Sequence, residues 1–257
     1  MKQQHFQPTS TSNTAGHHPP KNSDHPPASS AAHQIAQHAS LVPQSASPQT
    51  ASLLMAELAK PISQTDEAGY IYMFWLTPES GTPAPTASAA RSLLVPSGQP
   101  ITGGQRRGSD VLESYAAAQP KTRGVGGGGG TGTLLLKIGR ANNVQRRLNE
   151  WKRQCGYDLS LIRYYPYISS ASATSGDGDP STALPRKLPH SHKVERLIHI
   201  ELAGRGLRIM DGEKCPACNR EHREWFQVEA TRKAVMEVDE AIRRWSDWDE
   251  GRLRGAK

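Results

Sequence analysis

The chain has 257 residues, a formal net charge of +7 and only 6% aromatic residues, with a mean hydropathy of -0.63 and an isoelectric point near 9.4. With this polar composition, much of the chain cannot be buried in a hydrophobic core. We expect one folded domain of about 130 to 150 residues. The basic balance favours a polyanionic partner such as nucleic acid. No apolar run could span a bilayer and no signal-peptide region is visible, so we expect an intracellular protein without a membrane partner, and the basic charge points to the nucleus.

The N-terminal segment, residues 1–50, is rich in Ser, His, Pro, Gln and Thr, with Phe6 as its only aromatic residue. Such a segment cannot bury enough apolar surface to offset its ordering entropy, so it is predicted to be a disordered tail. Residues 51–68 are predicted to be a linker that contains a short amphipathic helix at 51–60.

Residues 69–229 are predicted to form the folded domain, interrupted by disordered insertions at 77–132 and 169–189. The run GYIYMFWL at 69–76 is rich in aromatic residues and predicts a buried strand. Both insertions are rich in Gly, Pro and Ser, and the first contains a glycine run at 126–130. Because structureless loops of more than about 15 residues are uncommon in compact domains, we expect disordered insertions here.

The remaining elements predict an α+β fold. Strands are expected at 134–138 and 159–168, a helix at 192–202, a short strand at 224–228, and a C-terminal helix at 230–248 within the final segment 230–257. The apolar stripe of this last helix is more typical of core packing than of a binding site. We expect a small, mostly antiparallel three-stranded sheet flanked by helices.

A basic helix follows the strand at 134–138. Gly139 lets the backbone leave that strand, and apolar residues then recur at the spacing of one buried helix face, at Val144, Leu148 and Trp151. Arg140 and Arg147, seven residues apart, are expected to share another face. Residues 137–163 hold seven Lys or Arg against two acidic residues, which favours phosphate over a merely solvated surface. The predicted partner is DNA, contacted by Arg140, Arg146, Arg147, Lys152 and Arg153.

A second chemical signal is the cysteine pair. Cys215, Cys218 and His222 have the spacing C-x2-C-x3-H, which lets two thiolates and an imidazole meet a tetrahedral zinc ion. A structural role is expected, because four protein ligands leave no open position. The fourth ligand stays open among Cys155, His190, His192 and His199. The alternative is a pair of reduced cysteines in a turn beside a surface histidine.

The order of these elements resembles the GIY-YIG endonuclease superfamily. It is more closely similar to the branch named for a T-five bacteriophage open-reading-frame DNA-binding domain, which includes a fungal meiotically up-regulated group. In this resemblance, the Gly-Ile-Tyr motif corresponds to Tyr70-Ile71-Tyr72 and the Tyr-Ile-Gly motif to Lys137-Ile138-Gly139. The family's helix arginine falls on Arg147 and its metal-binding glutamate on Glu195. Lys137 replaces the second motif tyrosine, and Asn219 is the nearest candidate for the family's late asparagine.

The resemblance implies phosphodiester hydrolysis, with Tyr72, Lys137, Arg147 and Glu195 as catalytic residues. Glu195 would hold one Mg²⁺ or Mn²⁺ ion, and Arg147 would neutralise charge on the phosphate. Tyr72 would orient or deprotonate water, with its pKa lowered by the field of Lys137. The alternatives without catalysis are that the tyrosines pack in the core, that the arginine is solvated, and that the glutamate forms an ion pair on the surface.

Three functions remain open on the sequence. The first is a metal-dependent DNA endonuclease. The second is a nucleic-acid-binding module on the same fold without cleavage, which Lys137 in place of tyrosine favours. The third is a zinc-stabilised protein-interaction domain, against which the basic charge argues. No heptad pattern predicts an oligomeric state.

Overall fold

A computed structural model of the chain describes residues 28–77, 86–94, 112, 132–167, 186–209, 214–215, 217–222 and 224–251. The chain divides into two units, residues 1–37 and 38–257, and helix α1 (Ala28–Leu41) runs from the first into the second. Helix α1 lies within the segment predicted to be a disordered tail. In the part of the chain described, no helix is long and apolar enough to cross a membrane.

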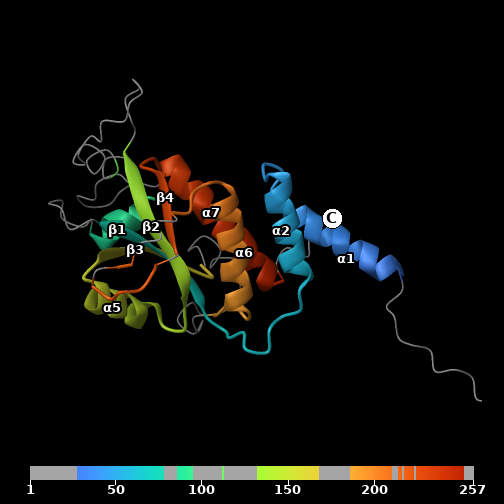
Figure 1. Ribbon diagram of the computed structural model, residues 1–257, viewed down its shortest axis with the longest axis horizontal. Coiled ribbons are helices and arrows are strands. Elements are labelled where there is room, and N and C mark those ends of the chain that lie inside the picture. Colours follow the sequence, from blue (N-terminus) through green and yellow to red (C-terminus); the bar gives the residue numbers. More distant parts are fainter. Residues whose placement is uncertain are drawn as a thin grey trace, which may run out of the picture. The chain divides into compact units, whose positions relative to one another are not determined.

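The centre of the second unit is an antiparallel sheet of four strands, not three as the sequence predicted. The strands are β1 (Tyr70–Thr77), β2 (Thr133–Ala141), β3 (Asp158–Tyr165) and β4 (Trp225–Glu229), in the spatial order β3-β1-β2-β4 (Figure 1). The short strand β4 supplies the difference, because it pairs with β2 from Thr133↔Glu229 to Lys137↔Trp225. One further main-chain hydrogen bond joins the Ile138 N–H to the Glu224 carbonyl at 3.2 Å. Beyond it, β4 leaves Gly139, Arg140 and Ala141 at the end of β2 uncovered on that edge.

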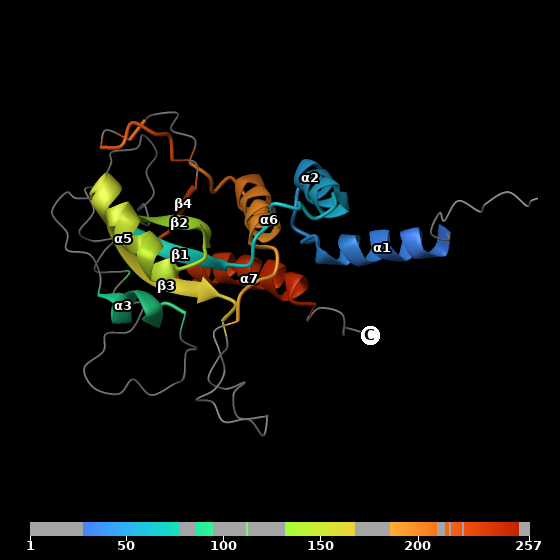
Figure 2. The same ribbon diagram turned by 90° about the horizontal axis from the view of Figure 1, so that it is seen from below.

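Side chains alternate between two faces along β1, as strand geometry requires. Ile71, Met73 and Trp75 belong to the larger core, whereas Tyr72, Phe74 and Leu76 belong to a smaller one. In both views of the ribbon, α5 (Val144–Cys155) lies on one side of the sheet, and α6 (Ser191–Gly204) and α7 (Arg232–Asp249) lie on the other (Figure 2). Each face of the sheet is therefore covered.

Helix α5 begins and ends at recognisable signals. The Asn143 side chain accepts a hydrogen bond from the Arg146 N–H at the start, and Gly156 ends the helix in the left-handed conformation with φ of 69°. Trp151 and Cys155 are buried beneath it, with Val144 and Leu148 partly buried in the same smaller core. This is the apolar face that the sequence predicted. A short helix, α3 (Ala87–Ser92), contacts β3 from inside the segment predicted to be the first insertion.

Helix α2 (Pro48–Ala59) packs against α6. It begins three residues before the predicted helix because Ser47 caps it by accepting from the Thr50 N–H, and Pro48 suits the first helical position. Leu54 and Leu58 are buried in the larger core. The ammonium of Lys193 on α6 donates to the main-chain carbonyls of Glu57 and Lys60. These bonds satisfy carbonyls at the end of α2 and fix it to α6.

A buried carboxylate joins α6 to α7. Glu201 is only 1% exposed, forms ion pairs with Arg205 and Arg244, and accepts a hydrogen bond of 2.7 Å from the Trp245 indole N–H. A buried carboxylate with several charge-assisted hydrogen bonds has its bonding capacity satisfied. Removing it leaves those partners buried and unpaired.

We expect Glu201→Ala to lower the free energy of unfolding by about 3 to 5 kcal/mol, because Arg244 and Trp245 would lose their buried partner. Urea unfolding followed by circular dichroism measures this loss. As a control, Glu237→Ala removes an exposed carboxylate 4.0 Å from Lys233 and should change stability by less than about 0.5 kcal/mol. Equal losses in the two variants would contradict the assignment.

Candidate functional site

The candidate site lies where β2 extends beyond β4. Gly139 of β2 stands opposite Tyr72 of β1. A Cβ atom at Gly139 would lie 2.6 Å from the Tyr72 hydroxyl and 3.1 Å from the Glu224 carboxylate. Only glycine leaves room for these two groups. Gly139 lies within β2, which continues to Ala141, so the prediction that the backbone leaves the strand at Gly139 is wrong.

Lys137 is the centre of the smaller core. Its side chain is fully buried, and its Nζ lies 2.6 Å from Glu224 Oε2. The same ammonium lies 3.8 Å from the ring centroid of Trp151 and 4.8 Å from that of Trp225. Burial lowers the pKa of Lys137, and Glu224 opposes this shift. Burial would raise the pKa of Glu224, but the Lys137 ammonium outweighs it and holds that pKa below its usual value.

Tyr72 lies beside this pair and remains a neutral phenol. It is 1% exposed and stacks on Phe74 with ring centroids 4.4 Å apart. Burial first, and then the Glu224 carboxylate, raise the pKa of Tyr72 to about 12, and Arg147 opposes the rise. The prediction that Lys137 lowers this pKa is therefore wrong, because burial and the Glu224 carboxylate raise it.

Arg147 reaches the site from α5. It forms an ion pair of 3.3 Å with Glu150 on its own helix, and its guanidinium lies 5.1 Å from the Trp151 ring centroid. Its Nε is buried and has no hydrogen-bond partner among the residues described. A buried guanidinium N–H without a partner is suited to donate a hydrogen bond to the oxygen of an anion.

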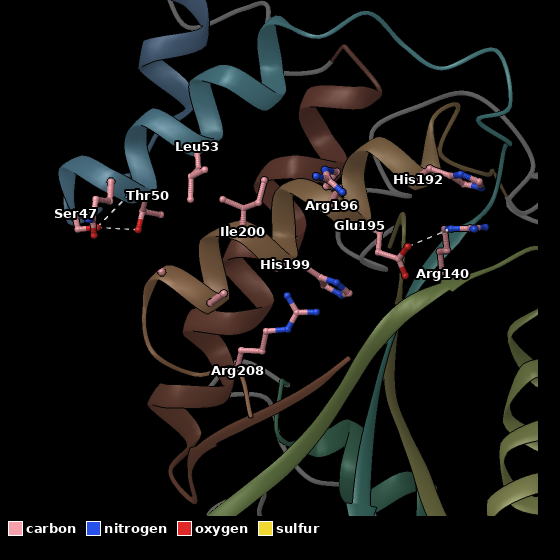
Figure 3. A pocket seen from close by; sticks show the side chains of 13 residues that line it. Ser47, Thr50, Leu53, Arg140, His192, Glu195, Arg196, His199, Ile200 and Arg208 are labelled. Atoms are coloured by element: carbon pink, nitrogen blue, oxygen red, sulfur yellow. Dashed lines mark hydrogen bonds and ion pairs between the residues drawn. The ribbon is translucent and has the colours of Figure 1, made fainter. Parts of the chain in front are cut away.

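Glu195 approaches from α6, on the opposite side of the sheet. Its carboxylate lies 3.2 Å from Arg140 Nε, as the dashed line in Figure 3 shows. Burial first, and then repulsion from Glu224, raise the pKa of Glu195 to about 7. Nearby, the His199 ring bonds to the Ile138 carbonyl at 3.0 Å, and burial lowers its pKa. Glu195 and Glu224 thus interact electrostatically around the uncovered end of β2.

The other residues predicted to contact DNA do not gather at this site. Arg146, Lys152 and Arg153 are exposed on α5, and each has a partner: Arg146 pairs with Glu150 at 3.4 Å, Lys152 with Asp158 at 3.5 Å, and Arg153 Nε donates to the Asn149 carbonyl at 3.4 Å. Arg140 belongs to β2 rather than to the helix. The expectation that it shares a face with Arg147 is wrong, because it points to Glu195 on α6.

Three cysteines and a histidine gather next to this site. The ligand atoms of Cys155, Cys215, Cys218 and His222 all lie within 4.8 Å of one another, so they could hold a metal ion. Cys155, at the end of α5, thereby takes the fourth position that the sequence left open. The alternative His190 instead bonds to Asp249 at 2.7 Å, and Asn219 lies in the turn of the cluster with φ of 55°.

The cysteine thiols differ in their protonation. Burial first raises the pKa of Cys155, to about 12. Burial also acts to raise the pKa of Cys215, but the Tyr157 hydroxyl at 3.5 Å and main-chain N–H groups outweigh it and bring that pKa to about 6. Thiolate is the form that binds metal, and a bound cation would deprotonate the remaining thiols. The His222 ring packs edge-on to Trp151, 4.7 Å between centroids, which places the cluster beside the ring that contacts the Lys137 ammonium.

The sequence interpretation missed Glu224. The available signal was Lys137, a lysine within an otherwise apolar strand, because a fully buried ammonium requires a carboxylate partner. Which carboxylate that is depends on β4 pairing with β2, which local pattern does not specify.

Residues 133–248 match the family described as Meiotically up-regulated gene 113. The chain is also 30% identical over 117 residues to the Meiotically up-regulated gene 113 protein of Schizosaccharomyces pombe. This similarity covers 45% of the chain but only 31% of the length of that relative. No solved structure matches the chain significantly. The matched residues contain β2, α5, α6, β4 and the cysteine–histidine cluster, whereas β1 and α2 precede them.

The raised pKa of Glu195 predicts a pH-dependent stability. Between its ordinary value of 4.5 and about 7, the folded chain retains a proton that the unfolded chain has released. Stability contributed by this group is therefore lost as pH rises through that interval. Relative to Glu195→Gln, the wild type should lose about 3 kcal/mol of unfolding free energy between about pH 4 and pH 8.

Urea unfolding across this interval, without added divalent cations, measures the difference. Glu237→Gln is the matched control, since its carboxylate is 54% exposed. If wild type and Glu195→Gln show the same pH profile, the Glu195 carboxyl titrates normally in the fold.

Proposed function

We propose that the chain binds DNA through its phosphates at the uncovered end of β2. One observation carries this proposal: side chains from β1, β2, α5 and α6 interact with the Glu224 carboxylate, which immediately precedes β4. Its charge acts on four groups that are far apart in sequence, Tyr72, Lys137, Arg147 and Glu195. The order of these residues supports membership of the GIY-YIG superfamily.

Within this proposal, Arg147 is the principal phosphate ligand. Its planar fork suits phosphate oxygens, and its buried Nε has no partner among the described residues. The Tyr72 hydroxyl, kept protonated by its pKa of about 12, can donate a second hydrogen bond. A DNA partner would also place the protein inside the cell, in the nucleus where the cell has one.

The same site has groups for phosphodiester hydrolysis. Among the residues described, only the cysteine–histidine cluster gathers three or more possible metal ligands. Glu195 would therefore hold Mg²⁺ or Mn²⁺ as a single carboxylate, with phosphate and water completing the shell, which is a common arrangement for Mg²⁺. Such an ion would polarise the phosphate. Arg147 would stabilise the charge that develops on it, and Tyr72 would orient water as a donor.

DNA binding without cleavage is the second candidate, and it too has a specific observation in its favour. Lys137 replaces the second motif tyrosine and is neutralised by Glu224 at 2.6 Å, while Tyr72 has a pKa of about 12. Lys137 cannot supply the hydroxyl of the second motif tyrosine, and Tyr72 stays protonated, so neither residue acts as a base at neutral pH. Hydrolysis would then depend on the ion at Glu195 alone.

We further propose that the cluster of Cys155, Cys215, Cys218 and His222 holds a structural zinc ion. Three thiolates and one imidazole are a common zinc ligand set, and four protein ligands leave no open position. The ion would tie the end of α5 to the segment that enters β4.

Cleavage of supercoiled plasmid with Mg²⁺ or Mn²⁺ tests the hydrolytic role. We expect nicking by the wild type and a loss of about 100-fold or more in Glu195→Gln and Arg147→Ala, because the first removes the ion's ligand and the second the phosphate ligand. Glu237→Gln should cleave normally. Full activity in Glu195→Gln would exclude the metal role, whereas binding without nicking in the wild type would establish the second candidate.

Metal analysis tests the zinc proposal. The purified wild type should contain about one zinc ion per chain, and Cys155→Ser should lose most of it. Removing the ion with a chelator should lower the unfolding temperature by about 10 °C, as expected for a tightly bound ligand of a domain this size. His190→Gln should retain the zinc, since His190 lies outside the cluster. Equal zinc in wild type and Cys155→Ser would rule out this ligand set.

A further inference from the structure

A groove runs along α6 from the candidate site to α2. It encloses about 800 Å³ and is lined by Arg140, His192, Glu195, Arg196, His199 and Arg208 together with residues of α2. Figure 3 shows Arg140 and Glu195 at one end, Ser47 and Thr50 at the other, and His199 and Arg208 between them. The groove therefore begins at a residue of the candidate site and leads away from it.

The charges that line the groove are mainly positive. Three arginines face one carboxylate, Glu195. Arg196 is bonded to Glu57 at 2.9 Å, yet its side chain remains 65% exposed, so a second anion can still reach it. Arg140 is 37% exposed in its pair with Glu195. In addition, His192 has a buried Nε2 without a hydrogen-bond partner among the residues described. This combination favours an anionic ligand.

The length of the groove suits a polymer better than a single small anion. From His192 to Gly204, both of which line it, α6 rises about 18 Å. One strand of B-form DNA places a phosphate about every 3.4 Å along the axis, so several phosphates match this distance.

We infer that this groove holds the DNA backbone flanking the phosphate bound at the end of β2, and that α2 forms its outer wall. The inference rests on the proposed function and adds to the site a wall formed by α2, which lies outside the matched residues 133–248. The α2 wall is held in place before any ligand binds: a Cβ at Gly204 would lie 2.2 Å from the Thr50 hydroxyl, so α2 and α6 are in close contact there. A preformed wall reduces the ordering entropy lost on binding.

Gln49 offers a test that spares the fold. It is exposed and lines the groove from the first turn of α2, where a negative charge favours the helix. Gln49→Glu should weaken binding to a labelled DNA duplex by about 3- to 10-fold at moderate salt, and Gln49→Lys should tighten it. Arg208→Gln should weaken binding and reduce the slope of log K against log salt by about 1. Gln34→Glu adds the same charge to exposed α1 and is the matched control.

The outcomes separate the inference from the proposed function. If wild type does not bind the duplex in a salt-dependent way, the proposed function fails and the inference with it. If Arg147→Ala weakens binding but both Gln49 variants and Arg208→Gln match the wild type, the groove is not a DNA site while the proposed function stands. If Arg208→Gln unfolds, the opposite shifts of Gln49→Glu and Gln49→Lys against Gln34→Glu decide the matter, and equal affinities overturn the inference.

Discussion

The buried ammonium of Lys137 constrains how this fold assembles. Removing a charge from water costs several kcal/mol unless a well-placed partner compensates it. Here the compensation comes from the Glu224 carboxylate at 2.6 Å and from the ring faces of Trp151 and Trp225. These partners belong to α5 and to the start of β4, so both elements must dock on the sheet before Lys137 is satisfied. The smaller core is therefore organised around a charge rather than around apolar contacts alone.

The cysteine–histidine cluster acts on the same two elements. Cys155 is the last residue of α5, and His222 lies two residues before Glu224. A metal ion held by these ligands would fix the helix that carries Trp151 and Arg147 relative to the segment that carries Glu224. The candidate site is thus supported from one side by the sheet and from the other by the cluster. Contacts of this kind around a site limit how far its functional side chains can move from their required positions.

Much of the local structure could be predicted from the sequence, because the spacing of apolar residues and the capping of helices depend on residues close together in the chain. The strand at β1, the apolar face of α5 and the C-terminal helix all followed from residue spacing. The pairing of β4 with β2 could not be predicted, since a strand of five residues carries no information about its neighbour. The same limit hid Glu224 and left Cys155 as one of four candidates. Arg140 was misplaced because the strand continues past Gly139 to Ala141, whereas the glycine suggested an earlier end.

Most of the basic residues predicted to contact DNA are paired with carboxylates in the folded chain. Arg140, Arg146 and Lys152 each have a carboxylate partner, so a phosphate must compete with that partner for the cation. At Arg140 the competition depends on Glu195, since an ion bound by Glu195 would weaken its hold on the arginine. On the proposed function, metal and phosphate would then bind cooperatively, each favouring the other through one carboxylate. Arg147 also pairs with a carboxylate, that of Glu150 at 3.3 Å, but its Nε has no partner in the described structure and can donate to a phosphate oxygen without this exchange.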